Sequence, residues 1–128
     1  MNTNAIAQRT ILLVDDEEMI RQIGSRMLEK LGYRVLMAAS GPQAIEELSR
    51  QEGQIAVVIF DMMMPGLPAE ELYDCMKSIA SNVRFLLASG YGRDAKIDSI
   101  LGRSCDGFIQ KPFKMVDLQR AVDEILKR

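Results

Sequence analysis

Residues 11–16 read Ile-Leu-Leu-Val-Asp-Asp, an apolar run that ends in two carboxylates. Two later apolar runs, at residues 55–61 and 108–111, end in an aspartate and in a lysine. Continuous apolar runs of this length are typical of parallel strands that are buried on both faces. Open α/β folds place ligands beyond the carboxyl ends of such strands. We therefore expect three carboxylates and one ammonium at one edge of a sheet.

Apolar runs alternate with helical patterns five times along the chain. The expected strands cover residues 10–14, 34–38, 55–60, 83–88 and 107–110. The expected helices cover about residues 18–31, a stretch that begins at residues 40–42, and about residues 69–80, 94–103 and 115–126. Five such units predict a three-layer, doubly wound α/β sandwich with a five-stranded parallel sheet. The flavodoxin-like strand order 2-1-3-4-5 places the switch point between strands 1 and 3, which both end in aspartates.

Helical spacing also predicts which side chains face the core. In the helix at about residues 18–31, the expected core-facing side chains are Ile20, Ile23, Met27, Leu28 and Leu31. Gly32 is expected to end that helix.

Length and composition indicate one globular domain. The chain has 128 residues, of which 48% are hydrophobic, and a formal net charge of −2, which gives no reason to expect nucleic-acid binding. We expect a flexible segment at residues 1–9 and a single domain at residues 10–128. No apolar stretch approaches the ~20 residues of a membrane span. The two cysteines lack a CxxC spacing, so we expect a reducing, cytoplasmic setting.

The residues at the expected sheet edge favour a divalent cation. Asp15, Asp16 and Asp61 outnumber the single Lys111, and a divalent ion would balance the excess negative charge. Histidine is absent from the chain, so the available ligands are hard oxygens, which favour Mg²⁺, with Mn²⁺ or Ca²⁺ as substitutes. Taken singly, the aspartates could be helix-capping or turn residues and the lysine a surface residue. Only their combination at neighbouring strand ends predicts a metal and phosphoryl site.

Four motifs together resemble the receiver domain of bacterial two-component response regulators. The motifs are Leu-Leu-Val-Asp-Asp-Glu at 12–17, Asp-Met-Met-Met-Pro-Gly at 61–66, Ser-Gly at 89–90 and Lys-Pro-Phe at 111–113. The likeness covers about residues 9–127. The stretches around the last two motifs also resemble receivers that are attached to hybrid sensor kinases.

The resemblance implies metal and phosphoryl roles for the matched residues. Asp61 would be the phosphoacceptor, which takes a phosphoryl group from the phosphohistidine of a histidine kinase or histidine phosphotransfer protein. Asp16 and Asp61 would bind Mg²⁺ directly, together with the main-chain carbonyl of Met63. Asp15 would hold the metal, often through water, and Lys111 would pair with the phosphoryl oxygens.

The resemblance also implies a switch. Ser89 would turn its hydroxyl toward the phosphoryl group, although turn chemistry is a simpler explanation for a serine before glycine. Phe108 would change rotamer as the signal passes, although such a residue is more often a core or edge aromatic. The bond from Lys111 to Pro112 would be cis. The implied protein is a phosphorylation-controlled signalling switch rather than an enzyme with turnover, and either a monomer or a weak dimer through its fourth and fifth helices.

The sequence departs from the family pattern after the second motif. Residues 67–69 read Leu-Pro-Ala, where the family often shows a hydrophobic residue, Asp or Asn, and Gly, so we expect a loop of different shape. Met63 and Tyr91 are bulky and do not activate water well. We therefore predict slow loss of the phosphoryl group.

Three other classes of protein are compatible with parts of the pattern. A metal-dependent phosphatase or phosphotransferase of the haloacid-dehalogenase type would also use an aspartate nucleophile, but its second acid would stand where Met63 is. A flavodoxin-like cofactor binder would need a phosphate-cradling loop after the first strand, and here residues 15–18 are all acidic. A purely structural interaction domain is the third alternative.

Overall fold

The computed structural model describes residues 8–51, 53–90, 92 and 94–127. Its strands are β1 (Thr10–Val14), β2 (Arg34–Ala38), β3 (Ile55–Asp61), β4 (Arg84–Ser89) and β5 (Gly107–Gln110). Its helices are α2 (Glu18–Lys30), α3 (Gly41–Arg50), α4 (Ala69–Ile79), α5 (Ala95–Leu101) and α6 (Met115–Leu126). Of the segment expected to be flexible, only Gln8 and Arg9 lie among the described residues.

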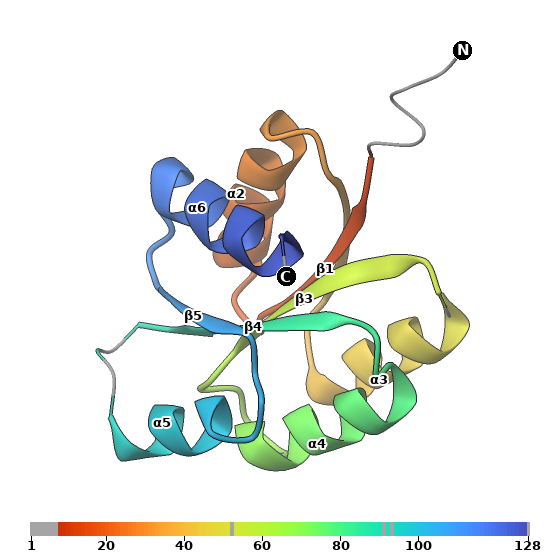
Figure 1. Cartoon of the computed structure of the whole chain (residues 1–128), viewed down its shortest axis with the longest axis vertical. Coiled ribbons are helices and arrows are strands. Elements are labelled where there is room, and N and C mark those ends of the chain that lie inside the picture. Colours follow the sequence, from red (N-terminus) through yellow and green to blue (C-terminus); the bar gives the residue numbers. More distant parts are fainter. Residues whose placement is uncertain (1–7, 52, 91, 93, 128) are drawn as a thin grey trace.

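The strands form one parallel sheet in the order β2-β1-β3-β4-β5. Helices α2 and α6 cover one face of the sheet, and α3, α4 and α5 cover the other (Figure 1). This arrangement confirms the expected three-layer α/β sandwich and its strand order. Because all five strands run in the same direction, their carboxyl ends share one edge.

The continuous apolar runs follow from this layering. Successive side chains of a strand point to opposite faces. In β1, Ile11 and Leu13 pack with the cluster under α2 and α6, whereas Leu12 and Val14 pack with the cluster under α3, α4 and α5. All five residues of β1 are buried. Since both faces are covered, neither set of side chains needs to be polar.

Local signals fix several element ends. The hydroxyl of Ser40 accepts a hydrogen bond from the Gln43 amide at 3.2 Å and so caps α3. Gly32 follows α2 with a φ of 101°, which is the backbone conformation that glycine tolerates best. Strand β4 begins and ends one residue later than expected, so Ser89 is its last residue.

The expectation that Ile23 faces the core is wrong. Its side chain is 43% exposed, and the buried residues of α2 are Gly24, Ser25 and Leu28. A Cβ atom at Gly24 would lie 2.8 Å from Leu13 Cδ2, so α2 approaches β1 closely at this glycine. This close approach turns Ile23 toward solvent. Ile79 on α4 and Val116 on α6 are likewise exposed.

The two cysteines have contrasting environments. Cys75 on α4 is exposed, and Cys105 before β5 is buried. Burial raises the pKa of the Cys105 thiol to about 11. Both thiols are free.

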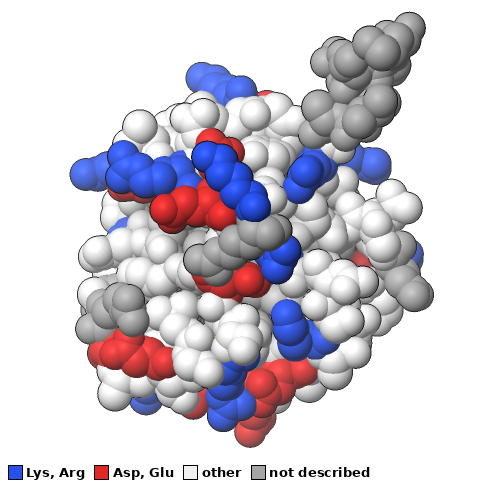
Figure 2. All heavy atoms as spheres, viewed as in Figure 1, with Lys and Arg blue, Asp and Glu red and all other residues white. Residues whose placement is uncertain are grey.

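Charged side chains of both signs are interspersed over the face seen in Figure 2, as suits a net charge close to zero. Within the described ranges, no helix combines the length and the apolar content that a bilayer crossing requires.

Candidate functional site

Three carboxylates meet at the carboxyl edge of the sheet. Asp15 and Asp16 directly follow β1, and Asp61 is the last residue of β3. The two strands are neighbours in register, with Val14 opposite Phe60. Consequently one carboxylate oxygen from each aspartate lies within 4.8 Å of the others. This cluster consists of hard oxygen ligands, which fit Mg²⁺.

Lys111 reaches the cluster from the end of β5. Its Nζ lies 2.9 Å from Asp15 Oδ2, 3.0 Å from Asp61 Oδ1 and 3.6 Å from Glu17 Oε1. The Lys111 amide also donates to the Ser89 carbonyl at 2.7 Å, and the bond to Pro112 is cis, as the resemblance implied. The side chain is 9% exposed, so the ammonium is largely shielded from water.

Asp61 is a buried carboxylate with incomplete hydrogen bonding. Its side chain is 2% exposed, and Oδ1 makes an ion pair with the Lys111 ammonium at 3.0 Å but has no hydrogen-bond partner among the described residues. Burial raises the pKa of Asp61, and the charge of Asp15 adds to this rise; the Lys111 ammonium and the Met63 amide only partly oppose it. A divalent cation would supply the missing positive charge.

The site favours the charged form of Lys111. Burial by itself lowers its pKa, but the carboxylates of Asp15 and Asp61 outweigh burial and raise it. The lysine is therefore charged at neutral pH. The cluster therefore combines one positive charge, on Lys111, with three carboxylates.

The site opens to solvent through a hollow of about 350 Å³. Its lining residues are Glu17, Asp61, Met63, Gly90 and Lys111. Met63 is 59% exposed at the mouth of the hollow, and Asp16 is also exposed. A phosphoryl donor could therefore reach Asp61 from outside.

Ser89 and Phe108 are not part of the carboxylate cluster. Ser89 is 1% exposed and lines an adjoining hollow of about 300 Å³ with Met62, Met63 and Asp94. Met63 lines both hollows. Phe108 is half-buried on β5 and packs against the cluster under α3, α4 and α5. Tyr91, which was expected to restrict water, lies outside the described residues.

Sequence reasoning missed two residues that contact Asp15. The Arg21 Nη1 donates to the Asp15 carbonyl at 2.7 Å, and the Glu17 amide donates to Asp15 Oδ1 at 2.9 Å. Only the position of Arg21, shortly after the aspartates on the following helix, could have drawn attention to it. An arginine in a helix is usually a solvated residue.

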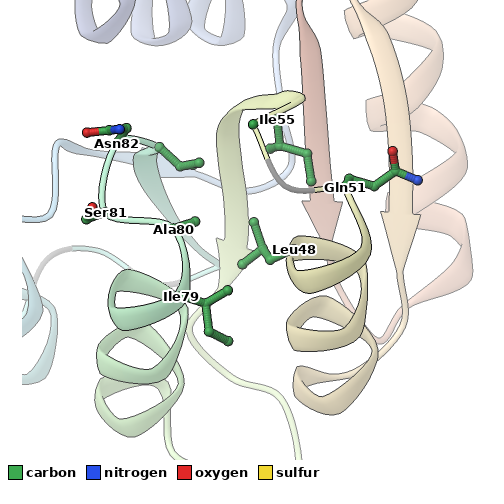
Figure 3. Close-up of a pocket in the computed structure, with 9 residues that line it drawn as sticks. Leu48, Gln51, Ile55, Ile79, Ala80, Ser81 and Asn82 are labelled. Carbon is green, nitrogen blue, oxygen red and sulfur yellow. The ribbon is translucent and has the colours of Figure 1, made fainter.

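Another hollow, of about 470 Å³, lies at the opposite end of the sheet (Figure 3). Leu48 and Ile79 extend into the space between the ends of α3 and α4, close to Ile55 at the start of β3. The residues that line it carry no charge. It lacks the groups that phosphoryl chemistry requires and is separate from Asp61.

The chain matches known proteins over almost its whole length. The response regulator receiver domain family matches residues 11–123. The chain is 32% identical over 126 residues to the sensor kinase CckA of Brucella abortus, which covers 98% of this chain but only 13% of the kinase. It is 30% identical over 116 residues to the sporulation initiation phosphotransferase F of Bacillus subtilis, with 91% of this chain and 92% of that protein covered.

A solved structure agrees with these matches. The crystal structure of a response regulator receiver domain protein from Clostridium thermocellum is similar with a TM-score of 0.87 at 28% identity, over 94% of this chain and 95% of that one. The matches do not favour the alternative of an aspartate-nucleophile phosphatase, and Met63 replaces the second acid that such an enzyme would need. The chain belongs to the response regulator receiver domain family.

Proposed function

We propose that this chain is a phosphoacceptor switch of a two-component phosphorelay. It accepts a phosphoryl group onto Asp61 from the phosphohistidine of a histidine kinase or histidine phosphotransfer protein, with Mg²⁺ as the cofactor. One observation carries the proposal: a buried Asp61 carboxylate with an incompletely satisfied oxygen lies between the Asp15–Asp16 pair and Lys111.

The chemistry needs position and positive charge more than a base. The Asp61 carboxylate is already ionised when it attacks, so a chain without histidine can supply the nucleophile. A bond forms between an Asp61 oxygen and phosphorus, the bond from phosphorus to the donor imidazole nitrogen breaks, and that nitrogen takes a proton from water. When bound by the three aspartates, Mg²⁺ would offset the charge of the carboxylates and of the transferred oxygens.

Lys111 and Ser89 are suited to hold the product. The Lys111 ammonium lies 3.0 Å from Asp61 Oδ1 and can pair with phosphoryl oxygens attached there. Ser89 is fixed to Lys111 through its carbonyl, so both residues border the site from adjacent strands. A phosphoryl group adds roughly two negative charges. We expect this change to move Ser89 and Phe108 and to alter the surface formed by α5, β5 and α6.

A combined phosphorylation and binding experiment tests the function. The protein is incubated with Mg²⁺ and either acetyl phosphate or beryllofluoride, and its mass and NMR spectrum are recorded. We expect the mass to rise by one phosphoryl group and the spectrum to change around Ser89 and Lys111. Asp61→Asn should show neither effect, while Asp117→Asn, on the exposed surface of α6, serves as the matched control. An equal response from Asp61→Asn would rule out the assignment.

A further inference from the structure

Arg21 on α2 extends back to the end of β1. Its Nη1 donates to the main-chain carbonyl of Asp15 at 2.7 Å, and the side chain is half-buried. Among the described residues, no carboxylate oxygen lies within ion-pair distance of Arg21. The contact of its guanidinium is therefore with a backbone oxygen rather than with an acidic side chain.

The contacted oxygen belongs to the peptide that joins the first two metal-site aspartates. Asp15 is beyond the last paired residue of β1, but its amide still donates to the Ala38 carbonyl at 3.1 Å. Its side chain is fixed by the Glu17 amide and by Lys111. Because a peptide unit is planar, the bond to the Asp15 carbonyl also fixes the plane that contains the Asp16 nitrogen.

We propose that Arg21 is a positioning residue for the metal site, which orients the Asp15–Asp16 peptide so that the Asp16 carboxylate joins those of Asp15 and Asp61. Asp16 is exposed, so burial does not hold its side chain in place. The proposal rests on the proposed function, because Mg²⁺ is the ligand that the three aspartates would share.

The positive charge of Arg21 would by itself weaken Mg²⁺ binding, whereas its positioning role would strengthen it. A cation near an acidic pocket repels Mg²⁺, so removing it would tighten metal binding if charge were its only contribution. That contribution is a few-fold at most for a half-exposed, screened group. Loss of a group that orients a metal ligand typically weakens binding by ~10- to 100-fold. The direction of the change in affinity therefore separates the two roles.

Calorimetric titration with Mg²⁺ alone tests the proposal. We expect Arg21→Ala to weaken Mg²⁺ binding on the order of 10-fold. Arg21→Lys, which keeps a charged donor on a long side chain, should recover most of the loss. Arg26→Ala removes the same charge from an exposed position of the same helix and should leave the affinity close to that of the wild type. Thermal unfolding without metal shows whether each variant is folded, and Arg21→Gln replaces Arg21→Ala if the alanine variant is not.

The phosphorylation rate provides a second readout. With acetyl phosphate, Arg21→Ala should react slowly at low Mg²⁺ and reach the wild-type rate once Mg²⁺ is saturating. The positioning role is overturned if Arg21→Ala binds Mg²⁺ as tightly as Arg26→Ala or more tightly. It is also overturned if the phosphorylation rate of Arg21→Ala stays low at saturating Mg²⁺. A wild-type protein that binds no Mg²⁺ overturns the proposed function together with this inference, so the two failures can be told apart.

Discussion

The Lys111 ammonium lies 3.0 Å from Asp61 Oδ1, where it forms an ion pair. Its hydrogen bond goes to Asp15 Oδ2, at 2.9 Å. As a result, Lys111 offsets part of the charge of Asp61 and leaves one of its oxygens without a hydrogen-bond partner among the described residues. A cation or a phosphoryl group at Asp61 would therefore meet a buried carboxylate oxygen that is not hydrogen-bonded among the described residues.

Asp61→Asn should stabilise the metal-free protein at neutral pH. The raised pKa of Asp61 shows that its environment disfavours the ionised form, and asparagine has the same shape without the charge. Mg²⁺ at 100 times its Kd should stabilise the wild type by about 2.7 kcal/mol and should have little effect on the variant. Chemical denaturation with EDTA or with Mg²⁺ measures both effects. Lower stability of the variant in EDTA would show that the folded protein favours the ionised form of Asp61.

The contribution of Asp61 to the stability of the metal-free protein should fall as pH rises through its titration. The folded chain keeps the Asp61 proton above 3.8, the ordinary pKa at which the unfolded chain releases it. Its contribution is therefore fully present below pH 3.8 and is lost as pH rises to the raised, folded pKa. The difference in unfolding free energy between the wild type and Asp61→Asn, measured in EDTA across this range, isolates the effect. A difference that does not vary with pH would show that Asp61 titrates alike in the folded and unfolded chain.

Lys111→Ala should destabilise the metal-free protein but retain Mg²⁺ binding. Removing the ammonium leaves Asp15 and Asp61 buried without it, and breaking a buried pair in this way typically costs about 3–5 kcal/mol. Mg²⁺ no longer competes with a lysine, so its affinity should hold or increase, whereas the response to phosphorylation should weaken. Denaturation measures the stability and calorimetry measures the Mg²⁺ affinity. The exposed Lys114→Ala serves as the control. Collapse of Mg²⁺ affinity would mean that Lys111 organises the metal ligands.

Met63→Asn should shorten the lifetime of the phosphoryl group. Met63 is an exposed, apolar side chain that lines the hollow over Asp61, and an amide in its place could orient an attacking water. The decay of phosphorylated protein in Mg²⁺, followed by mass spectrometry, gives the lifetime. Met19→Asn changes a similarly exposed methionine on α2 and should leave the decay unchanged. A wild-type half-life of seconds would remove the reason for assigning Met63 a protective role.

Gly24→Ala should destabilise the protein, although alanine favours helices by about 1 kcal/mol over glycine. The added Cβ would lie 2.8 Å from Leu13 Cδ2 and 3.2 Å from Phe113 Cε2, both in buried side chains. Overpacking of this kind costs about 1–3 kcal/mol, so we expect a net loss. The melting temperature of Gly24→Ala compared with Arg26→Ala, on the same helix, measures it. A higher melting temperature would show that α2 can move away from β1.

The fold was predictable because its signals are local and repeated. Each buried parallel strand is a continuous apolar run, and turn and capping residues such as Ser40 and Gly32 mark the boundaries between elements. The juxtaposition of Asp15, Asp16, Asp61 and Lys111 was also predictable, because strand ends that share a sheet edge need only the strand order to be brought together.

The missed features depend on distances between elements, which periodicity does not contain. Ile23 fits a helical apolar pattern, but the small side of α2 at Gly24 faces the sheet because the helix packs closely there. Arg21 acts on a backbone oxygen, and no residue pattern marks such a contact. Ser89 was correctly placed at a strand end, yet only the structure shows that it borders an adjoining hollow.

The contrast between the two thiols gives the unaltered chain a built-in attachment point for a spectroscopic probe. Cys105 is buried and has a pKa of about 11, so at neutral pH a maleimide dye should react at the exposed Cys75 alone. Cys75 follows Asp74, whose carboxylate pairs with Arg103 just beyond α5. A dye attached there would report movement between α4 and α5, in a protein that has no tryptophan of its own to do so.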